Sequence, residues 1–542
     1  MMDFKIFQKP QRYIGNEWNA IKKSNYYKKI KICISYPDLY EVGMSNLGIR
    51  IIYGILNSFS DVVCERVFMP GNDLISFLKK TKRKLFSLET KTPLDEFEII
   101  GFNFNYELNF TNFLHILDLG GIPLKTKERR NIIVIGGGVA NPEPLADFVD
   151  LFLLGEFEEI AEDFVKVLRQ YKDKESRLKL LSQKEGFYIP KFYSFFFYKD
   201  NYIFEKKYPY AKFPLKRVYV KDLNKSFYPL KWLTPYTSIV HDRAQIEIAR
   251  GCPNRCTFCQ ARSIYYPYRE RKVSTIKEII KKIYESSGYE NFSFLALSAS
   301  DYSSLEALIE ETIDYFKEKR IGLSLPSLRV KDIIGKLYRK LSLLKKTSLT
   351  VAIEAARGSL REKLNKRLRL EELFEAAKII RTLKIKHIKI YFMFGLPEEE
   401  EQDLIAIGNL LDKLSKESKL NLNISINIFI PKPFSLWEGI NMQGEEILKN
   451  KRKLILKNIP RQRSIKISLS YLKKSILEAV ISRGDRRISK VIYRAYLKGA
   501  RLDGYREGFC WKIWEDSFKE EEIDYHFYLS KNTKNFPWSF IM

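Results

Sequence analysis

The sequence predicts an α/β protein built from two parallel sheets and a mainly helical C-terminal region. Short, continuous apolar runs alternate with helix-like segments over residues 30–171 and again over 245–440. Continuous apolar runs are typical of strands that are buried on both faces, as in parallel sheets. The regular alternation of strand and helix patterns indicates βα units. We expect four regions: 1–171, a connector at 172–244, 245–440 and 441–542.

The first region is predicted to form a doubly wound sheet. The expected helices cover 45–59, 72–80, 108–119 and 156–168, and the expected strands are Lys31–Ser35, Val62–Val67, Glu98–Phe102, Ile132–Ile135 and Val149–Leu154. Ligands of such sheets bind beyond the carboxyl ends of the strands. The loops at that edge are 36–45, 69–73, 103–106, 136–144 and 155–158.

The region 245–440 is predicted to form an incomplete (βα)6 barrel. The expected strands are Gln245–Ala249, Phe292–Leu297, Gly322–Leu325, Ser348–Ile353, Ile388–Phe392 and Ile424–Phe429. No clear seventh or eighth unit follows. A parallel barrel carries its chemistry at the carboxyl ends of its strands. Residues 441–542 are expected to be helical and basic at first, and then rich in turns.

Composition limits the classes of function. The 542 residues include 94 basic and 66 acidic ones, for a net charge of +28. Such a balance indicates an acidic partner, with nucleic acid first, although the chain is rich in lysine throughout. No apolar run approaches the ~18 residues of a membrane span, and the N-terminus lacks the apolar core of a signal peptide. We expect a cytosolic protein; the sequence does not define its oligomeric state.

Three of the six cysteines form a group, Cys252, Cys256 and Cys259, with the spacing C-x3-C-x2-C. Thiolates are soft ligands that suit iron–sulfur clusters and zinc. Three ligands leave one iron of a [4Fe–4S] cluster open to another molecule. A zinc site usually needs four ligands, and His241 lies upstream of the strand. A purely structural cluster is the other alternative.

This motif and the segments after it resemble the radical S-adenosylmethionine (SAM) superfamily. The resemblance implies a [4Fe–4S] cluster on the three cysteines and SAM as cofactor. It also implies roles for residues at later strand ends: Ser298, Ala299 and Ser300 near the SAM amino group, Arg329 near its carboxylate, Glu354 at the ribose, and Gly395 and Pro397 at the adenine. Each of these has a simpler alternative, such as an ordinary turn or a surface ion pair.

The whole chain is similar to one subgroup, in which a cobalamin (B12)-binding-like domain precedes the radical SAM barrel. The similarity lies in Tyr36–Gly48, Ile100–Leu108, Gly136–Pro144 and Ser482–Arg487. Gly136, Gly137 and Gly138 would allow a close approach to a ligand, or form a tight turn. The Asp-x-His-x-x-Gly motif is absent, and His115, His241, His387 and His526 do not lie where an axial ligand should come from. Cobalamin binding therefore stays open.

The resemblance implies an enzyme that cleaves SAM reductively, taking its electron from a flavodoxin- or ferredoxin-like donor. The resulting radical would abstract hydrogen from a substrate or act with cobalamin in methyl transfer. The basic charge makes RNA or a ribosome-linked molecule the first substrate hypothesis, and Arg483, Arg486, Arg487 and Arg494 would contact phosphate or form a solvated helix face. The alternatives are an enzyme acting on a small metabolite or lipid, and a noncatalytic electron-transfer or assembly protein.

Overall fold

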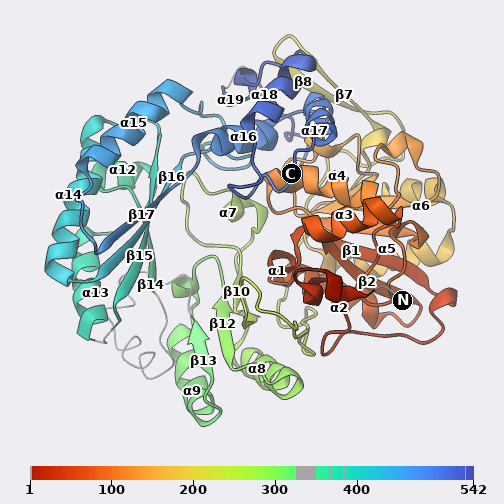
Figure 1. Ribbon diagram of the computed structural model, residues 1–542, viewed down its shortest axis with the longest axis horizontal. Helices are drawn as coiled ribbons and strands as arrows, with labels where there is room; N and C mark the ends of the chain where they lie inside the picture. The colour runs from red at the N-terminus through yellow and green to blue at the C-terminus, as the bar shows by residue number, and fades with distance from the viewer. Residues whose placement is uncertain (1–2, 325–348, 367, 383–384, 531–532) are drawn as a thin grey trace. The chain divides into compact units, whose positions relative to one another are not determined.

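The computed structural model describes residues 3–324, 349–366, 368–382, 385–530 and 533–542. These residues form two compact units. The first contains residues 1–242, 480–528 and 532–542, and the second contains residues 243–479 and 529–531. The predicted C-terminal region 441–542 is therefore divided between the units, and its last part completes the N-terminal one. Figure 1 labels the elements of both units.

The first unit contains a six-stranded sheet in the order β2-β1-β3-β4-β5-β6. Strands β1 to β5 are parallel, and β6 is antiparallel to β5. Their bounds are β1 Ile30–Leu39, β2 Val62–Met69, β3 Ile99–Asn103, β4 Ile133–Gly137, β5 Leu151–Leu153 and β6 Phe187–Tyr188. All eight residues of β2 are buried, as its apolar sequence predicts. The order 2-1-3-4-5 is that of flavodoxin-like sheets. In such sheets the ligand crevice lies at the switch point between β1 and β3.

Helices connect these strands, and the local sequence explains where several of them begin. The α2 helix begins after Asn46, whose side chain accepts a hydrogen bond from the backbone N–H of Ile49. The helices of this part are α1 Tyr40–Gly43, α2 Leu47–Ser58, α3 Asn72–Thr81, α4 Phe110–Leu119, α5 Phe157–Gln170 and α6 Lys174–Leu181. An antiparallel hairpin, β7 Tyr193–Tyr198 with β8 Asn201–Lys206, lies in the connector.

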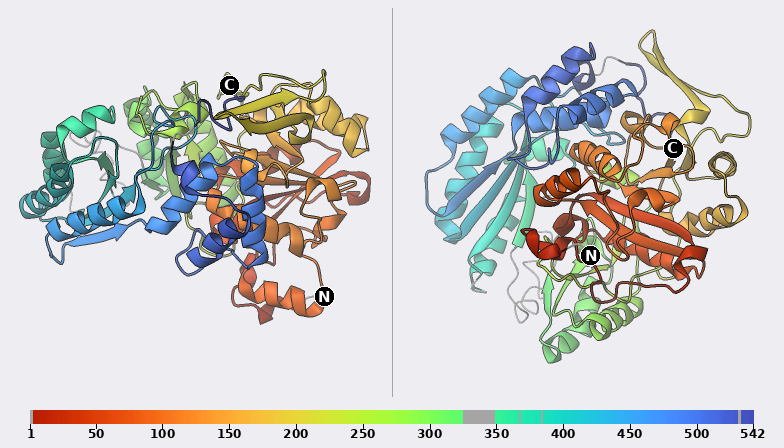
Figure 2. Two further views of the ribbon diagram at one scale, coloured as in Figure 1. Left: turned by 90° about the horizontal axis from the view of Figure 1, so that it is seen from above. Right: turned by 45° about the vertical axis from the view of Figure 1, so that its right-hand side comes forward.

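The C-terminal residues of the first unit pack against its N-terminal part. Two helices, α17 (Arg487–Leu497) and α18 (Trp511–Glu520), contact each other, and α17 also contacts α4. The two views in Figures 1 and 2 show α17 beside α4. The short helix α19 (His526–Leu529) follows. Residues nearly 400 positions apart in sequence therefore share one core.

The second unit contains two parallel sheets, β13-β12-β9 and β14-β15-β16-β17. Their bounds are β9 Ala244–Glu247, β12 Asn291–Leu295, β13 Gly322–Ser324, β14 Leu349–Glu354, β15 His387–Phe394, β16 Asn421–Ile428 and β17 Ile465–Leu469. The six predicted strands are present. The parallel strand β17 was not predicted, because its sequence Ile-Lys-Ile-Ser-Leu alternates and keeps only Ile465 buried. A short antiparallel pair, β10 Ala249–Arg250 and β11 Arg269–Glu270, follows β9.

Helices separate the parallel strands of this unit. Figures 1 and 2 show α13, α14 and α15 along one face of the four-stranded sheet. Glu400 and Asp403 form a reciprocal capping box at the start of α14, which fixes where that helix begins. The helices are α7 Gln260–Ile264, α8 Val273–Ser287, α9 Leu305–Glu318, α12 Gly358–Lys363, α13 Leu370–Thr382, α14 Glu401–Ser418, α15 Glu445–Asn458 and α16 Leu472–Arg483. The last of these continues into the first unit.

Candidate functional site

The three grouped cysteines lie in the loop that follows the short strand β10, between Gly251 and the start of α7. Gly251 has φ +83°, and a Cβ at this position would lie 2.6 Å from the carbonyl oxygen of Tyr265 and 2.8 Å from that of Pro267. Only glycine fits this close approach without a shift of the backbone. The chain therefore turns sharply before Cys252.

The cysteine side chains are partly exposed and close enough to influence one another. Burial raises the pKa of the Cys256 thiol, and the charges of Cys259 and Cys252 raise it further. Burial also raises the pKa of the Cys259 thiol, against the lowering effect of the backbone N–H of Arg262. The side-chain amide of Asn254 lies 3.3 Å from the sulfur of Cys252. The loop thus gathers three thiols at a surface that a cofactor can reach.

The sulfur geometry bears on the kind of metal site. Within the described ranges of the chain, no three Cys, His, Asp or Glu side chains converge closely enough to hold one metal ion. In an iron–sulfur cluster, each cysteine binds its own iron, so the sulfurs need not converge on one point. Three soft thiolates on one loop therefore fit a [4Fe–4S] cluster by their chemistry.

The loop after β12 is tied to the cysteine loop. The Asn254 amide donates a hydrogen bond of 2.6 Å to the Asp301 carboxylate, and the Tyr268 hydroxyl donates one of 2.9 Å to the Asp301 carbonyl. Asp301 ends the 3-10 turn Ala299–Asp301, which begins directly after Ser298. The predicted residues Ser298, Ala299 and Ser300 therefore lie next to the cysteine loop, with Ala299 buried and the two serines partly exposed.

Glu354 ends β14 in a backbone conformation that is unusual for its residue type. Its φ is +68°, and the register with β15 shifts between Ala352 and Glu354. The side chain is buried, and its carboxylate lies 3.3 Å from the ammonium of Lys366. A non-glycine residue with positive φ costs about 1–3 kcal/mol, and such residues cluster at functional sites.

The segment after α12 also packs on the cysteine loop. The Asn365 side-chain amide donates to the Arg255 carbonyl at 2.9 Å, and the Thr257 N–H donates to the Leu364 carbonyl at 3.3 Å. Lys366, the next residue, pairs with Glu354. Its charge opposes the larger effect of burial, which raises the pKa of the Cys256 thiol. The three cysteines and Glu354 therefore share one neighbourhood.

The loops after β15 and β16 complete this edge of the unit. The Gly395 N–H donates to the Glu399 carboxylate at 2.8 Å, and Pro397 is partly exposed two residues later. The Gln260 side chain donates to the Pro433 carbonyl at 3.0 Å, and the Trp437 N–H donates to the Thr257 carbonyl at 3.1 Å. Gly395 has φ +77°, a backbone conformation that favours glycine, so the turn itself accounts for glycine at this position.

An apolar cluster supports these loops from below. It contains Ala355, Leu360, Leu364, Leu396 and Phe429, with partly buried Phe258, Met393, Trp437 and Ile440 packed against it. Phe258 lies between Cys256 and Cys259, so the ends of β14, β15 and β16 share a core with the cysteine loop. Burial of such side chains stabilises the fold by about 1.5–3 kcal/mol each, which keeps the loops in place.

The structure adds three residues to the predicted site and does not describe one of the predicted residues. Arg329 lies outside the described residues. Asn254, Asp301 and Lys366 contact the predicted residues but were not assigned roles from the sequence. The only sequence signal for them was their position: Asn254 within the cysteine motif, Asp301 directly after Ser300, and Lys366 twelve residues after Glu354.

The three consecutive glycines after β4 pack against the protein itself. A Cβ at Gly136 would lie 2.9 Å from the rings of Phe104 and Phe152. A Cβ at Gly138, whose φ is +81°, would lie 2.6 Å from the side-chain oxygens of Asn103 and Asn105. At Gly137, the nearest atom would be the Cβ of Leu153 at 3.8 Å, an ordinary contact. Side chains of the first unit therefore explain Gly136 and Gly138 without a ligand.

The basic side chains near the C-terminus are engaged within the first unit. Arg483 donates to the Tyr528 carbonyl at 2.7 Å, and Arg486 pairs with Glu143 at 2.6 Å. Arg487 pairs with Asp485 at 2.7 Å, and Arg494 pairs with Glu521 at 2.7 Å. All four arginines that were expected to contact phosphate or solvent thus have acidic or carbonyl partners in the chain.

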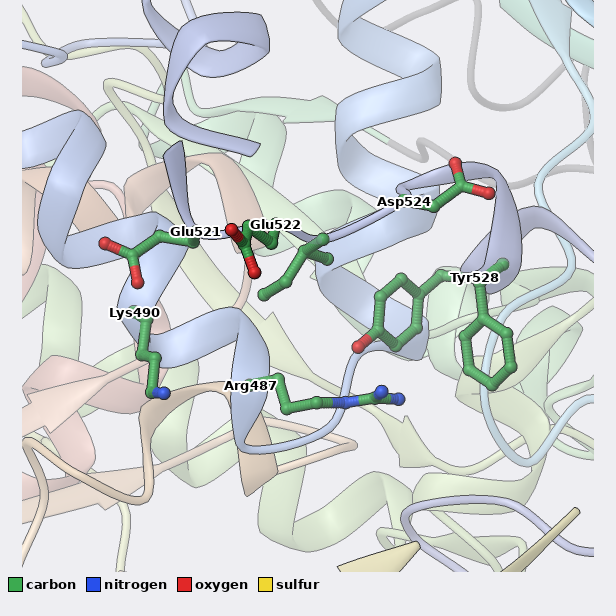
Figure 3. A pocket seen from close by; sticks show the side chains of 8 residues that line it. Arg487, Lys490, Glu521, Glu522, Asp524 and Tyr528 are labelled. Carbon is green, nitrogen blue, oxygen red and sulfur yellow. The ribbon is translucent and has the colours of Figure 1, made fainter. Parts of the chain in front are cut away.

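A cavity of about 390 Å³ opens beside two of the basic residues of α17 (Figure 3). Its lining combines two cations and three carboxylates with apolar and aromatic side chains, namely Arg487, Lys490, Glu521, Glu522, Ile523, Asp524, Phe527 and Tyr528. None of the residues predicted to hold SAM or the cluster lines it. Its mixed charge does not select a phosphate.

Among the described residues, no helix combines the length and the apolar character that crossing a membrane requires.

Two relatives were found that align with large parts of this chain. An uncharacterized protein of Methanocaldococcus jannaschii is 27% identical over 470 residues, which cover 86% of this chain and 91% of that protein. The tRNA-2-methylthio-N(6)-dimethylallyladenosine synthase of Thermosipho africanus is 24% identical over 246 residues, covering 43% of this chain and 55% of that enzyme. The chain thus aligns with about half of the second relative's length.

A methylthiotransferase and two solved structures extend these comparisons. The ribosomal protein uS12 methylthiotransferase of Clostridioides difficile is 24% identical over 34% of this chain and 43% of that enzyme. The methyltransferase TsrM of Kitasatospora setae has a TM-score of 0.48 at 12% identity, covering 76% of this chain and 75% of its own. The cobalamin-dependent SAM radical enzyme OxsB has a TM-score of 0.48 at 14% identity, covering 92% and 72%.

Two families match consecutive parts of the sequence. Residues 48–190 match the family described as radical SAM proteins, N-terminal. Residues 246–411 match the radical SAM superfamily, and this range contains the cysteine loop and the ends of β12, β14 and β15. The matched ranges, the C-x3-C-x2-C loop and the strand-end residues gathered around it agree: the chain belongs to the radical SAM superfamily and is an enzyme that uses a [4Fe–4S] cluster and SAM.

Proposed function

We propose that this enzyme cleaves SAM reductively at the carboxyl edge of its second unit and uses the product to modify an RNA or a ribosome-linked substrate. The convergence of three segments, which follow β12, β14 and β16, on the cysteine loop is the observation that supports this site best. Asp301, Leu364, Asn365 and Pro433 all contact that loop.

In this proposal, the thiolates of Cys252, Cys256 and Cys259 hold the cluster. A bound cluster would supply an open iron for SAM and the electron for its reductive cleavage. Ser298 to Ser300 would hold the amino group of SAM, Glu354 would accept hydrogen bonds from its ribose, and Gly395 and Pro397 would border its adenine. Lys366 keeps the Glu354 carboxylate in position through their ion pair. A flavodoxin- or ferredoxin-like protein delivers the electron.

The substrate hypothesis is supported by charge and by relatives. A net charge of +28 favours a polyanionic partner. Two relatives are named for modifying a tRNA nucleoside and a ribosomal protein. A small metabolite or lipid is the second candidate, because a hopanoid methylase of Methylococcus capsulatus is 31% identical over 146 residues. Methyl transfer with cobalamin is a rival to this reaction, and the cobalamin-retention measurement described below separates the two.

Anaerobic reconstitution tests the proposal. The wild-type protein, supplied with iron, sulfide, dithionite and SAM, is expected to bind about four irons per chain and to release 5′-deoxyadenosine. Cys259→Ala should lose iron and reduce this product at least 100-fold, because a thiolate ligand is removed.

The matched control is Cys510→Ala, which changes an exposed cysteine outside the site. It should keep both iron and product. No 5′-deoxyadenosine from the wild type, under conditions in which a known radical SAM enzyme forms it, would contradict the proposed reaction.

A further inference from the structure

The carboxyl edge of the six-stranded sheet is where a flavodoxin-like fold binds a ligand, at the crevice between β1 and β3. In this protein, that edge is contacted by residues of the chain's own C-terminal part. These residues belong to two stretches, 482–489 and 500–505. Both stretches are part of the first unit.

The stretch 500–505 is bound at the crevice itself. Asp38, near the end of β1, accepts a hydrogen bond of 2.7 Å from the Tyr505 hydroxyl. Asn112, on α4, accepts one of 2.7 Å from the Leu502 N–H and donates one of 3.0 Å to the Pro37 carbonyl. The same side chain thus joins the end of β1 to the C-terminal stretch.

Asp503 and Gly504 in this stretch make further contacts within the first unit. Asp503 is buried and accepts 2.8 Å and 3.1 Å hydrogen bonds from Thr111 and Trp514. Gly504 approaches Tyr106 so closely that a Cβ would lie 3.3 Å from its ring. The stretch therefore contacts the end of β1 and Tyr106 in the loop after β3, whereas Asn105 of that loop stays exposed.

The stretch 482–489 binds the loop after β4, so that two segments singled out by the sequence contact each other. The Asn141 amide donates to the carbonyls of Ser482 and Gly484 at 3.1 Å and 2.6 Å. The buried Glu143 carboxylate pairs with Arg486, and the Ser489 hydroxyl donates to the Pro144 carbonyl at 2.9 Å. The glycines before this loop already pack against phenylalanine and asparagine side chains, as described above.

We propose that the C-terminal stretches 482–489 and 500–505 occupy the β1 side of the crevice at the carboxyl edge of the N-terminal sheet, so that this edge does not accept cobalamin in the folded protein. Tyr505 and Leu502 bind Asp38 and Asn112 beside the end of β1, where a flavodoxin-like fold holds its ligand. The domain then serves to anchor the C-terminal part of the chain. The chemistry at the cysteine loop does not depend on a corrin at this edge.

Two measurements on the anaerobically reconstituted full-length protein test this inference. After incubation with a fivefold excess of hydroxocobalamin and gel filtration, the protein should retain less than 0.1 equivalent by its absorption spectrum. Amide hydrogen exchange in 500–505 should be slower than in a free peptide by a factor of at least 1,000. Retention of one equivalent of cobalamin by the wild type, or exchange in 500–505 at the rate of a free peptide, would overturn the proposal.

The variant Thr111→Val, combined with Tyr505→Phe, removes two hydrogen-bond donors at this edge without changing side-chain size much. Exchange in 500–505 should become at least tenfold faster in this variant. Tyr525→Phe, a tyrosine of the same unit that packs on Trp511 and Phe518, is the matched control and should leave that exchange unchanged. Equal exchange in the double variant and the wild type would contradict the assigned contacts. Release of 5′-deoxyadenosine in the same preparations reports separately on the proposed reaction.

Discussion

Glu354 combines a buried carboxylate, a left-handed backbone and a lysine partner at the end of one strand. A side chain in this position costs stability, since a positive φ is unfavourable for any residue with a Cβ. Packing against the apolar cluster that includes Ala355 keeps the backbone in this conformation. The carboxylate is therefore held in place before any ligand arrives.

We expect Glu354→Gln to weaken SAM binding about tenfold, because a neutral amide replaces the charged acceptor proposed for the ribose hydroxyls. Equilibrium dialysis with labelled SAM measures the change, and iron content should stay at the wild-type value. Glu398→Gln is the matched control: this glutamate also has a positive φ but is 72% exposed and pairs with Lys363. Equal losses of affinity in both variants would assign the effect to the fold and not to the ribose contact.

At the residue scale, the sequence predicted the features that depend on residue spacing. It did not predict the contacts between residues that are distant in sequence. The cysteine spacing indicated three thiols on one short segment, and the structure places them on one loop after Gly251. Asn254 and Asp301 could not be paired from the sequence, because their hydrogen bond joins loops 47 residues apart. The arginines of 483–494 were expected to contact phosphate or solvent. Partners such as Glu143 and Tyr528 lie in other elements, so the sequence around the arginines does not indicate them.

The elements themselves were predicted to within a few residues wherever apolar runs were continuous. The bounds of strands β2 and β4 lie within two residues of the predicted ones at each end. The strand β17 was missed, since an edge strand with alternating polar residues resembles a surface segment. The C-terminal region is mainly helical, as predicted, but it also contains β17 and is divided between the units: α15 and the start of α16 belong to the second unit, and α17 and α18 to the first.

His115 on α4 contacts the C-terminal part of the first unit, and this contact affects its pKa. Burial lowers its pKa to about 4, and the nearby charge of Arg501 acts in the same direction, whereas Asp118 opposes it. Its Nε2 lies 3.0 Å from the Ala500 carbonyl, and its ring meets that of Tyr496 at 4.7 Å. The neutral imidazole thus joins α4 to the start of the stretch 500–505.

This lowered pKa predicts acid sensitivity of the first unit. The unfolded chain takes up the proton near pH 6.5 and the folded one near pH 4, so stability is present above pH 6.5 and is lost as pH falls toward 4. The contribution of one such group changes by up to about 1.4 kcal/mol per pH unit. Urea unfolding at pH 7, 6 and 5 should show a smaller pH dependence for His115→Gln than for the wild type. An identical pH dependence would show that His115 is not protonated on unfolding in this range.

At the scale of the whole molecule, charge is the property most directly connected to the substrate. The 94 basic residues exceed the acidic ones by 28, although many are paired within the chain. If the substrate is RNA, basic residues release counterions when they contact phosphate, and the affinity then falls steeply with salt.

We therefore expect the affinity for a tRNA transcript to fall by on the order of 100-fold between 50 and 200 mM KCl, as filter binding or anisotropy would measure. The affinity for SAM serves as the internal control and should change less than threefold. Weak RNA binding that salt does not affect, together with intact SAM cleavage, would favour the small metabolite or lipid as substrate.

The split of the first unit between residues 1–242 and the residues from 480 onward has a consequence for biosynthesis. The ribosome delivers the N-terminal sheet long before the stretch that covers its carboxyl edge. At about 5–20 residues per second, the intervening unit takes roughly 10 to 50 s to synthesise. During that interval Asp38, Asn112 and Glu143 have no C-terminal partner, so the nascent sheet presents polar and apolar surface that later becomes core. The part of the first unit at 1–242 is therefore made well before the part from residue 480 onward, and it reaches its final form only after that later part is made.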